Sequence, residues 1–367
     1  MIRIFEEKMA TESTLKYLIT DLLTACDVSR EDSITTADVL IAAELRDIPS
    51  HGLLRLSDYI RMLRTGRINP QAAPQIIHQS PSTVTLDGDN GIGPAVAARA
   101  MDLAIEKAEN AGTGWVAVQN SNHFGIAGYY AMRALAKDMI GLCMTNANPL
   151  VAPTFSAEGL LGTNPFAMAV PAGKKPPLVA DFASAAIARG KVDLLHKKGL
   201  HIEPGFVQDH EGVSSTDPGI LTRGGTILPL GSSRQYGSHK GYCLASIVDI
   251  LSAVLPGANF GPFVPPSVSW LPTKDNLPGK GTGHFFGAIR IDAFRPAKDF
   301  KENMDHWIRV FREARPAKGE EKVLIPGDPE RMAEEKNSKN GICIQDKVKE
   351  QIRELCSELH VSNPLES

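Results

Sequence analysis

Ser82-Thr83-Val84-Thr85-Leu86-Asp87-Gly88-Asp89-Asn90-Gly91 is the stretch of sequence that decides the fold class. Its β-branched start is typical of a strand, and its end, rich in Asp, Gly and Asn, is typical of a turn. The segment from Ala95 to Asn110 then predicts a helix, and the run Trp115-Val116-Ala117-Val118 predicts a second strand. A strand, a helix and a strand in close succession indicate α/β structure.

The same alternation continues along the chain. A helix is expected from Ala127 to Asp138, and strands are expected at Ile140–Thr145, Ala167–Val170 and Phe285–Ile291. We therefore predict a mixed sheet covered by helices. The stretch from Pro256 to Gly283 is rich in Pro and Gly, which predicts a long ordered loop of the kind that often borders an active site.

Both ends of the chain are expected to be helical. Apolar residues recur at helical spacing between Glu12 and about Gly66, and charged amphipathic helices are expected at Lys301–Ala314 and Asp346–Leu359. A chain of 367 residues exceeds what one compact core usually organises, so more than one lobe is expected. The predicted organisation is an N-terminal helical region at 1–75, a mixed α/β core at 76–300, and a C-terminal helical region at 301–367 that packs on the N-terminal part.

Composition and charge exclude several classes of function. A net charge of -3 with both signs well mixed leaves no basic stripe, so binding to a nucleic acid or to an anionic membrane is not expected. Charged residues interrupt the N-terminal segment, which has neither the apolar core of a signal peptide nor the length of a membrane span. The five cysteines are scattered without a C-x-x-C pair, and no His, Cys and carboxylate cluster has metal spacing. A cytoplasmic protein without a metal site is expected.

The clearest polar cluster is Ser50-His51-Gly52, with Arg55 one turn later. A histidine can pass a proton near neutral pH, and an arginine can clamp a carboxylate in a bidentate fork. Together they match the needs of reducing a 2-oxo acid. Taken alone, the same residues are equally compatible with a helix capped by Ser50, an incidental histidine and a surface arginine.

A second cluster, Asn120-Ser121-Asn122-His123-Phe124-Gly125-Ile126-Ala127-Gly128, lies between an expected strand and an expected helix. Such a turn presents backbone N–H groups at a helix N-terminus, where a pyrophosphate can bind, with His123 in the same crevice. The chain has no G-x-G-x-x-G sequence, so the Rossmann fingerprint is absent. A lone loop histidine is usually structural, and only its position after a strand favours a functional role for His123.

Two further segments carry candidate site residues. Leu178-Val179-Ala180-Asp181-Phe182-Ala183-Ser184 predicts a buried strand that ends in Asp181, a carboxylate that must be paired or close to water. Asp181 either orients a catalytic imidazole or caps the next helix. Lys240 precedes the apolar helix expected at Leu244–Leu255, where it either contacts a bound phosphate or stays solvated.

Seven motifs occur in a fixed order along the chain. They are Ile48-Pro49-Ser50-His51-Gly52-Leu53-Leu54-Arg55, Asn122-His123-Phe124-Gly125, Gly162-Thr163-Asn164-Pro165, Asp181-Phe182-Ala183, Arg189-Gly190-Lys191, Thr216-Asp217-Pro218 and Lys240-Gly241-Tyr242. In this order they resemble the malate/L-lactate dehydrogenase family, which also holds sulfolactate and ureidoglycolate dehydrogenases, 2,3-diketogulonate reductase and Δ1-piperideine-2-carboxylate reductase. Each motif is weak alone. The resemblance runs from about residue 12 to residue 350.

The resemblance implies an oxidoreductase that uses NAD or NADP to interconvert a small 2-hydroxy acid and its 2-oxo acid. Malate is the first choice of substrate, and lactate-like acids come next. Reduction of a cyclic imino acid or a sugar-derived diketo acid, or a ureidoglycolate-type reaction, is the alternative. A homodimer is implied, in which the mixed-sheet core at 76–300 binds the nicotinamide cofactor without the Rossmann fold.

The resemblance also implies roles for single residues. His51 and His123 are both candidates for the acid/base group, with Ser50 and Asp181 as a relay that orients His51, which slightly favours His51. Arg55 and Tyr59 are expected to face the substrate carboxylate. The matching cofactor positions are His123, Phe124, Gly125, Ile126, Ala127, Ala147, Asn148, Asp181, Phe182, Ala183 and Lys240, with the loop at 280–282 less securely aligned.

Some features depart from the family pattern, and two other classes of function deserve weighing. Ser184-Ala185 stands where the family often has Thr-Ser, Cys243 stands where it often has Gly, and the charged region from Lys318 to Lys339 is longer. A non-catalytic binding protein is disfavoured because all the expected catalytic residues are present. A hydrolase built on Ser50, His51 and Asp181 is disfavoured because adjacent Ser and His side chains seldom converge, and no G-x-S-x-G sequence occurs.

Overall fold

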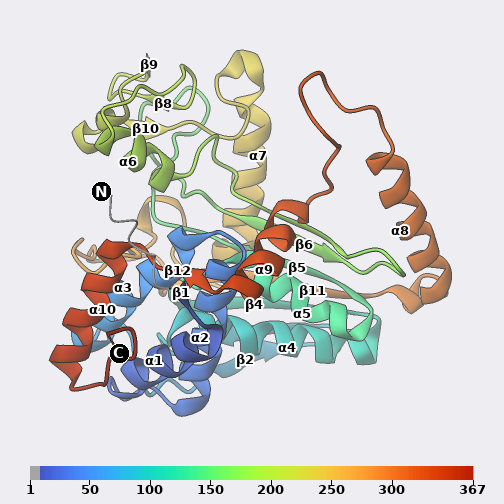
Figure 1. The fold of residues 1–367 in the computed structure, drawn as a ribbon, viewed down its shortest axis with the longest axis horizontal. Helices are drawn as coiled ribbons and strands as arrows, with labels where there is room; N and C mark the ends of the chain where they lie inside the picture. Colours follow the sequence, from blue (N-terminus) through green and yellow to red (C-terminus); the bar gives the residue numbers. More distant parts are fainter. Residues whose placement is uncertain (1–8, 367) are drawn as a thin grey trace, which may run out of the picture.

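A seven-stranded mixed sheet forms the centre of the protein (Figure 1). The computed structural model describes residues 9–366, so the first eight residues of the expected N-terminal region lie outside the described residues. The strand order is β2-β3-β4-β11-β5-β6-β7, with β3 and β4 parallel and the other neighbours antiparallel. The strands are β2 (Gln75–Gln79), β3 (Thr83–Asp87), β4 (Thr113–Ser121), β5 (Met139–Thr145), β6 (Phe166–Val170), β7 (Leu178–Phe182) and β11 (Thr282–Arg290). The expected mixed-sheet α/β fold is confirmed.

The segment that decides the fold class becomes β3 and the turn into α4 (Gly93–Ala111). A parallel neighbour requires a crossover, and α4 supplies it by returning the chain to β4. Pro94 lies in the first turn of α4, where its missing N–H costs nothing. The many alanines of α4 are buried against the sheet, which lets the helix approach closely.

Helices cover both faces of the sheet (Figure 1). Beside α4 lies α5 (Ala127–Arg133), which is followed by a 3-10 turn at Ala134–Lys137. On the other face lies α7 (Ser238–Asp249), which continues as a π-helical turn at Ile250–Val254. Alternation along β11 explains the two faces, because Phe286 and Ala288 are buried with α4 and α5, whereas Gly283 abuts Ser252.

The N-terminal helices share a second core with the end of the chain. Leucines and isoleucines of α1 (Glu12–Thr24), α2 (Arg30–Leu45), α3 (Leu56–Arg64) and α10 (Asp346–Leu359) form this core. Strand β1 (Met9–Ala10) also pairs with β12 (Ile342–Cys343). Helix α9 (Asp328–Asn340), which the sequence did not predict, lies against α2, where the Asn337 amide donates to Leu45 O at 3.0 Å.

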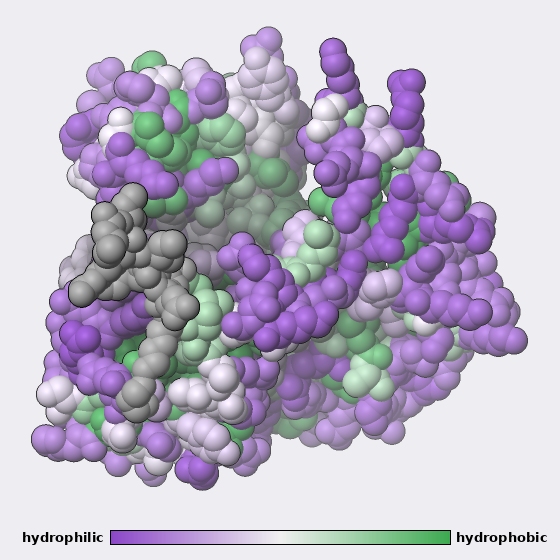
Figure 2. All heavy atoms as spheres, viewed as in Figure 1, coloured by the Kyte–Doolittle hydropathy of each residue, from purple (hydrophilic) through white to green (hydrophobic). Residues whose placement is uncertain are grey.

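A small lobe and a projecting arm complete the fold (Figure 1). The lobe holds α6 (Arg189–Lys197) and three short strands, β8 (Val207–Gln208), β9 (Ser214–Ser215) and β10 (Thr226–Ile227), over its own apolar core. The arm is α8 (Ala297–Arg312), whose Asp305 accepts backbone N–H groups from Gly173 to Lys175. Figure 2 shows a hollow between the lobe and the arm, with hydrophobic residues in its depth.

Candidate active site

The Ser50-His51-Gly52 segment lies in two short 3-10 turns, Pro49–His51 and Leu53–Arg55, between α2 and α3. Glu44 at the end of α2 holds this segment, because its carboxylate Oε1 accepts the Leu53 N–H at 2.7 Å. A Cβ at position 52 would lie 2.2 Å from that oxygen, so the contact requires glycine. Burial raises the pKa of Glu44. Sequence reasoning missed Glu44, although a carboxylate inside the apolar run from Ile41 to Leu45 was an available signal.

Ser50, His51 and Arg55 contact one another as expected from their spacing. Ser50 Oγ lies 2.9 Å from His51 Nδ1, and Arg55 Nε donates to the carbonyl of Ser50 at 2.8 Å. Burial and the positive charge of Arg55 lower the pKa of His51 to about 4, so the imidazole is neutral at pH 7. Among the described residues, the terminal guanidinium nitrogens of Arg55 have no partner and remain available to a ligand.

The structure brings His123 to this cluster. Its ring is stacked on His51 with centroids 5.5 Å apart, although 72 positions separate the two residues. Tyr59, expected to face the substrate carboxylate, is fully buried, and its hydroxyl lies 2.8 Å from His123 Nδ1. The pKa of His123 is lowered well below its usual range by burial and by the charge of Arg55, and protonation of the neighbouring His51 or His284 would lower it further.

The direction of the Tyr59–His123 hydrogen bond follows from burial. Burial raises the pKa of Tyr59, so the phenol keeps its proton. In the described part of the chain, the hydroxyl has one partner, His123 Nδ1. If Nδ1 were the donor, the phenol O–H would be buried without an acceptor, at a cost of about 1–3 kcal/mol. Donation from Tyr59 to Nδ1 is therefore favoured by roughly fivefold or more.

His284 is a further histidine of the site, and sequence reasoning missed it. It is fully buried in β11, with Nδ1 2.7 Å from Thr145 Oγ1 and Nε2 2.8 Å from Ser121 Oγ. Burial lowers its pKa to about 3, so it is neutral. Its ring is stacked on Phe124 at 4.7 Å, and it therefore supports the residue that follows His123. A histidine within the apolar strand was the signal that could have found it.

Asp181 lies at the end of β7 and joins the His123 segment rather than Ser50. Its carboxylate accepts the Gly128 N–H in the first turn of α5 at 2.7 Å. Asp181 is exposed to solvent in the edge strand β7, and partial desolvation of its carboxylate raises its pKa to about 6. The Gly128 N–H and Arg46 oppose the rise, whereas Glu330 of α9 adds to it. The anion at the start of α5 is thus Asp181 itself, where the sequence had suggested a pyrophosphate.

The remaining candidate cofactor residues lie on segments that are braced together. Asn164 accepts the Ala147 N–H at 3.1 Å and donates to Ala245 O of α7 at 3.0 Å. Next to it, the carbonyl of Thr163 accepts the N–H of Ser184 at 2.8 Å, which ties down the Asp181-Phe182-Ala183 segment. The Gly162-Thr163-Asn164-Pro165 motif therefore connects three of the predicted cofactor segments.

Lys240 lies in the first turn of α7, exposed to solvent. The side chain of Lys240 has no partner among the described residues, and the N-terminus of α7 has no side-chain cap. Gly241 abuts the backbone of Leu230, whose N–H donates to Ser184 O at 2.8 Å. This chain of contacts links the start of α7 to the Asp181 segment.

The predicted long loop meets α3 next to Tyr59. Ser269 donates its backbone N–H to Asp58 Oδ1 at 3.0 Å, and Arg67 donates to several loop carbonyls. Ser267 Oγ also donates to Asn148 Oδ1 at 3.3 Å. A cavity of about 140 Å³ lies between this loop and Asn148. At the other end of the loop, Lys280 O accepts the Asn120 N–H at 2.8 Å, just before the His123 segment.

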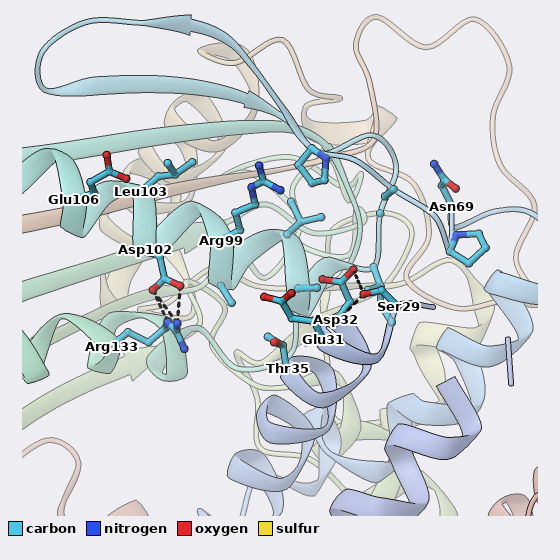
Figure 3. A pocket seen from close by; sticks show the side chains of 18 residues that line it. Ser29, Glu31, Asp32, Thr35, Asn69, Arg99, Asp102, Leu103, Glu106 and Arg133 are labelled. Carbon is cyan, nitrogen blue, oxygen red and sulfur yellow. Dashed lines mark hydrogen bonds and ion pairs between the residues drawn. The ribbon is translucent and has the colours of Figure 1, made fainter. Parts of the chain in front are cut away.

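A larger polar cavity of about 550 Å³ lies elsewhere, between α2 and α4 (Figure 3). Several of its polar groups already pair with each other, because Ser29 Oγ donates to Asp32 at 2.8 Å and Arg133 pairs with Asp102 at 2.6 Å. Arg99 points into it without a carboxylate partner among the described residues. None of the predicted catalytic or cofactor residues lines this cavity, so its size does not make it the active site.

Comparison with known proteins agrees with this geometry. The sequence profile described as malate/L-lactate dehydrogenase matches residues 10–353. The chain belongs to this family. It is 40% identical to a malate dehydrogenase of Pyrococcus abyssi over 93% of this chain and 92% of that protein. It is also 40% identical to an L-sulfolactate dehydrogenase of Methanocaldococcus jannaschii over 94% of this chain and 95% of that protein.

A solved structure shows the same fold in another member of the malate/L-lactate dehydrogenase family. Malate dehydrogenase from Entamoeba histolytica superposes with a TM-score of 0.90 at 35% identity, over 97% of this chain and 99% of that one. The resemblance stated from the seven motifs is thereby confirmed, and the chain is a 2-hydroxy acid dehydrogenase of this family. Within residues 9–366, no helix has both the length and the apolar character that crossing a membrane requires.

Proposed function

We propose that this dehydrogenase uses NAD or NADP to interconvert malate and oxaloacetate. The observation that carries the proposal is the stacking of His51 on His123 at 5.5 Å, beside Arg55, whose terminal guanidinium nitrogens pair with no other described residue. Two imidazoles and one guanidinium are the groups that a 2-oxo acid needs at its oxygen and at its carboxylate. Relatives named malate dehydrogenase and L-sulfolactate dehydrogenase are equally similar, so 3-sulfolactate is the second candidate substrate.

Arg55 is the proposed clamp for the substrate carboxylate. Its Nε is held by the carbonyl of Ser50, which orients the guanidinium plane, while the terminal nitrogens have no partner within residues 9–366. A planar fork matches both oxygens of a carboxylate at once. The bound carboxylate also offsets the positive charge of Arg55, which holds down the pKa of His51 in the free protein. Substrate binding is therefore expected to raise the pKa of His51.

His51 is the proposed acid/base group. It is half-buried, so it can exchange its proton with solvent, and Ser50 contacts its Nδ1. During reduction, His51 gives a proton to the C2 oxygen, and during oxidation it removes the proton from the C2 hydroxyl. Asp181 contributes by holding the start of α5, and with it the His123 segment.

The start of α7 is the proposed site for the phosphates of the cofactor. It offers an exposed ammonium on Lys240 and a helix N-terminus without a side-chain cap, and both favour a phosphate. The N-terminus of α5 fits less well, because the Asp181 carboxylate already occupies it. When bound, the nicotinamide supplies or accepts the hydride at C2. The residues from Asp181 to Ala183 and Ala147 with Asn148 are proposed to line the same cofactor site.

A homodimer is the proposed assembly. The outer face of α7 and the π-helical turn exposes apolar side chains, and α8 exposes a second group. Exposed apolar groups of this extent usually mark an interface between proteins. The exposed apolar side chains are Tyr242, Ile247, Ile250, Val254 and Leu255 on the face formed by α7 and the π-helical turn, and Trp307, Val310 and Phe311 on α8. The cytoplasm is the proposed location.

The proposal is tested with purified protein, NADH or NADPH, and a panel of 2-oxo acids at the same concentration. The panel holds oxaloacetate, 3-sulfopyruvate, pyruvate, a cyclic imino acid and a diketo acid, and the loss of nicotinamide absorbance is followed. We expect the largest kcat/KM with oxaloacetate. Oxidation of malate by NAD⁺ or NADP⁺ is measured as the reverse reaction. A largest value with another member of the panel assigns that substrate instead, and no turnover with any member refutes the proposed reaction class.

A further inference from the structure

The contacts of Tyr59 indicate a role in the active site that the proposed function does not assign to any residue. We infer that Tyr59 is a positioning residue that holds His123 in the tautomer with its proton on Nε2, so that His123 meets the C2 oxygen of the substrate as a neutral hydrogen-bond donor. This inference rests on the proposed function for the substrate, but the state of the His123 ring can be measured without it.

The Tyr59 hydroxyl carries one proton, and the position of this proton decides the direction of the hydrogen bond to His123. The side chain is fully buried in α3, so water cannot accept this proton. Within residues 9–366 the hydroxyl has one partner, His123 Nδ1, at 2.8 Å. Donation to Nδ1 satisfies both atoms, whereas the reverse direction leaves a buried O–H without an acceptor. Nδ1 is therefore the acceptor, and in a neutral imidazole the proton then lies on Nε2.

The second step is that His123 stays neutral. The charged and titratable groups that face it are His51, Arg55, His284 and Tyr59, and none of them is a carboxylate. A proton on Nδ1 would add a second positive charge close to Arg55. It would also have to point at the Tyr59 oxygen, whose own proton would then lose its acceptor. Tyr59 and Arg55 thus act in the same direction.

The third step connects the tautomer to the reaction. Nε2 of His123 has no partner among the described residues, and it lies on the ring that is stacked on His51. As an N–H donor it stabilises the negative charge that develops on the C2 oxygen when hydride reaches C2. His123 keeps its proton throughout. The proton that ends on the oxygen comes from the acid/base group, which the proposed function assigns to His51, so the two stacked histidines differ in role.

The first measurement reads the tautomer directly. The ¹⁵N chemical shifts of the histidine side chains are recorded on the full-length protein at pH 7, and His123 is assigned from the signal lost in His123→Asn. We expect an unprotonated Nδ1 and a protonated Nε2. A protonated Nδ1 in the unmodified protein would overturn the inference, and this outcome does not depend on any substrate or on the folding of a variant.

The second measurement compares Tyr59→Phe with Tyr130→Phe. Tyr130 is a matched control, because it is also fully buried and its hydroxyl donates to the carbonyl of Phe124, next to His123. In Tyr59→Phe we expect His123 to populate the Nδ1–H tautomer, and kcat to fall on the order of tenfold, the factor that one unsatisfied buried hydrogen bond corresponds to. KM should stay within about twofold, and Tyr130→Phe should leave the His123 shifts unchanged.

The outcomes separate this inference from the proposed function. If Tyr59→Phe raises KM for the 2-oxo acid and leaves kcat and the His123 shifts unchanged, Tyr59 contacts the substrate carboxylate instead, and the inference fails. If both variants change the His123 shifts alike, Tyr59 acts only through packing, and the inference fails. If the ¹⁵N shifts agree but no 2-oxo acid is turned over, the tautomer assignment stands, and the proposed reaction is what is wrong.

Discussion

The carboxylate of Asp181 accepts the backbone N–H of Gly128 at 2.7 Å, and this contact joins the end of β7 to the start of α5. The two residues are 53 positions apart in the sequence. A carboxylate at a helix N-terminus is stabilised by the free N–H groups there. Desolvation nevertheless raises the pKa of Asp181 to about 6. The contact with Gly128 favours the anion, whereas the partly desolvated surroundings favour the protonated form.

Asp181→Asn is expected to change stability in a pH-dependent way. The folded pKa of about 6 exceeds the ordinary value of 3.8, so the folded protein binds this proton more tightly than the unfolded chain. Stability contributed by Asp181 therefore falls as the pH rises from about 4 to about 6 and stays low above that. The Asn variant should melt at a higher temperature than the parent at pH 8, with little difference at pH 4. The gain should be modest because solvent reaches Asp181.

The matched control for this experiment is Asp305→Asn. Asp305 accepts three backbone N–H groups, which lower its pKa against an opposing effect of desolvation. Its stabilisation is present at neutral pH and is lost as the pH falls through the depressed pKa, so this variant should be less stable than the parent at pH 8. If Asp181→Asn changed the melting temperature by the same amount at pH 4 and at pH 8, the charge of Asp181 would not be the cause of the change in stability.

Glu44 and Gly52 are expected to be coupled. Gly52→Ala should destabilise the protein, because its Cβ would lie 2.2 Å from Glu44 Oε1. Glu44→Ala should cost about 1–3 kcal/mol in the free energy of unfolding, because the buried Leu53 N–H loses its acceptor. The double variant should lose less than the sum, since removing the carboxylate makes room for the methyl group. Urea unfolding gives the free energy of unfolding of all three variants. Gly190→Ala is the control, because a Cβ at position 190 would have no atom within 4 Å.

Arg55→Lys is expected to weaken substrate binding. Lysine keeps the charge but loses the planar fork and the Nε contact to Ser50 O. KM for oxaloacetate should rise by about tenfold or more, corresponding to ~1.4 kcal/mol, while the dissociation constant of NADH stays the same. Arg61→Lys, at an exposed arginine in the helix α3 that follows, should change neither value. An unchanged KM in Arg55→Lys would place the carboxylate clamp elsewhere.

The pH dependence of malate oxidation should report His51. The base must be neutral to accept a proton, and burial beside Arg55 lowers its pKa in the free protein to about 4. kcat/KM should therefore stay level from pH 8 to pH 6 and fall only as the pH approaches about 4. His51→Asn should lower kcat by roughly 10² to 10⁴-fold and remove this limb. His123→Asn should retain the fall in kcat/KM at low pH, since an amide still offers an N–H. If kcat/KM of the parent protein fell near pH 6.5 instead, the assignment of His51 as the base would be contradicted.

The outer face of α7 is expected to hold the dimer together. Ile247 is 51% exposed in the single chain, and aspartate at this position would place a charge in an apolar interface. Ile247→Asp should convert the dimer to a monomer, as measured by light scattering after size exclusion. Ile77→Asp is the matched control, because Ile77 is 53% exposed on the edge strand β2, away from this face. A dimer that survives Ile247→Asp would rule out this face as the interface.

Local patterns in the sequence were sufficient to predict most of the secondary structure. The helix expected at Asp346–Leu359 has these bounds in α10, and the strand expected at Ile140–Thr145 is β5 with one more residue. These elements can be predicted because the periodicity of their apolar residues is a property of the local sequence. The same holds for the strand-helix-strand unit that begins with Ser82–Gly91. The sequence did not predict α9 or the strands of the small lobe, because both are polar or very short and are stabilised by distant contacts.

By itself, the sequence determined the α/β class, the family and the identity of the residues Ser50, His51, Arg55 and His123, because each lies in a short motif. Only the tertiary structure decided which of them meet. Tyr59 and His123 form a hydrogen bond although they are 64 residues apart, and Asp181 accepts the N–H of Gly128, which is 53 residues away. Hydrogen bonds between such distant residues depend on how helices pack on the sheet, and burial then sets the charge of each group. No local pattern carries that information.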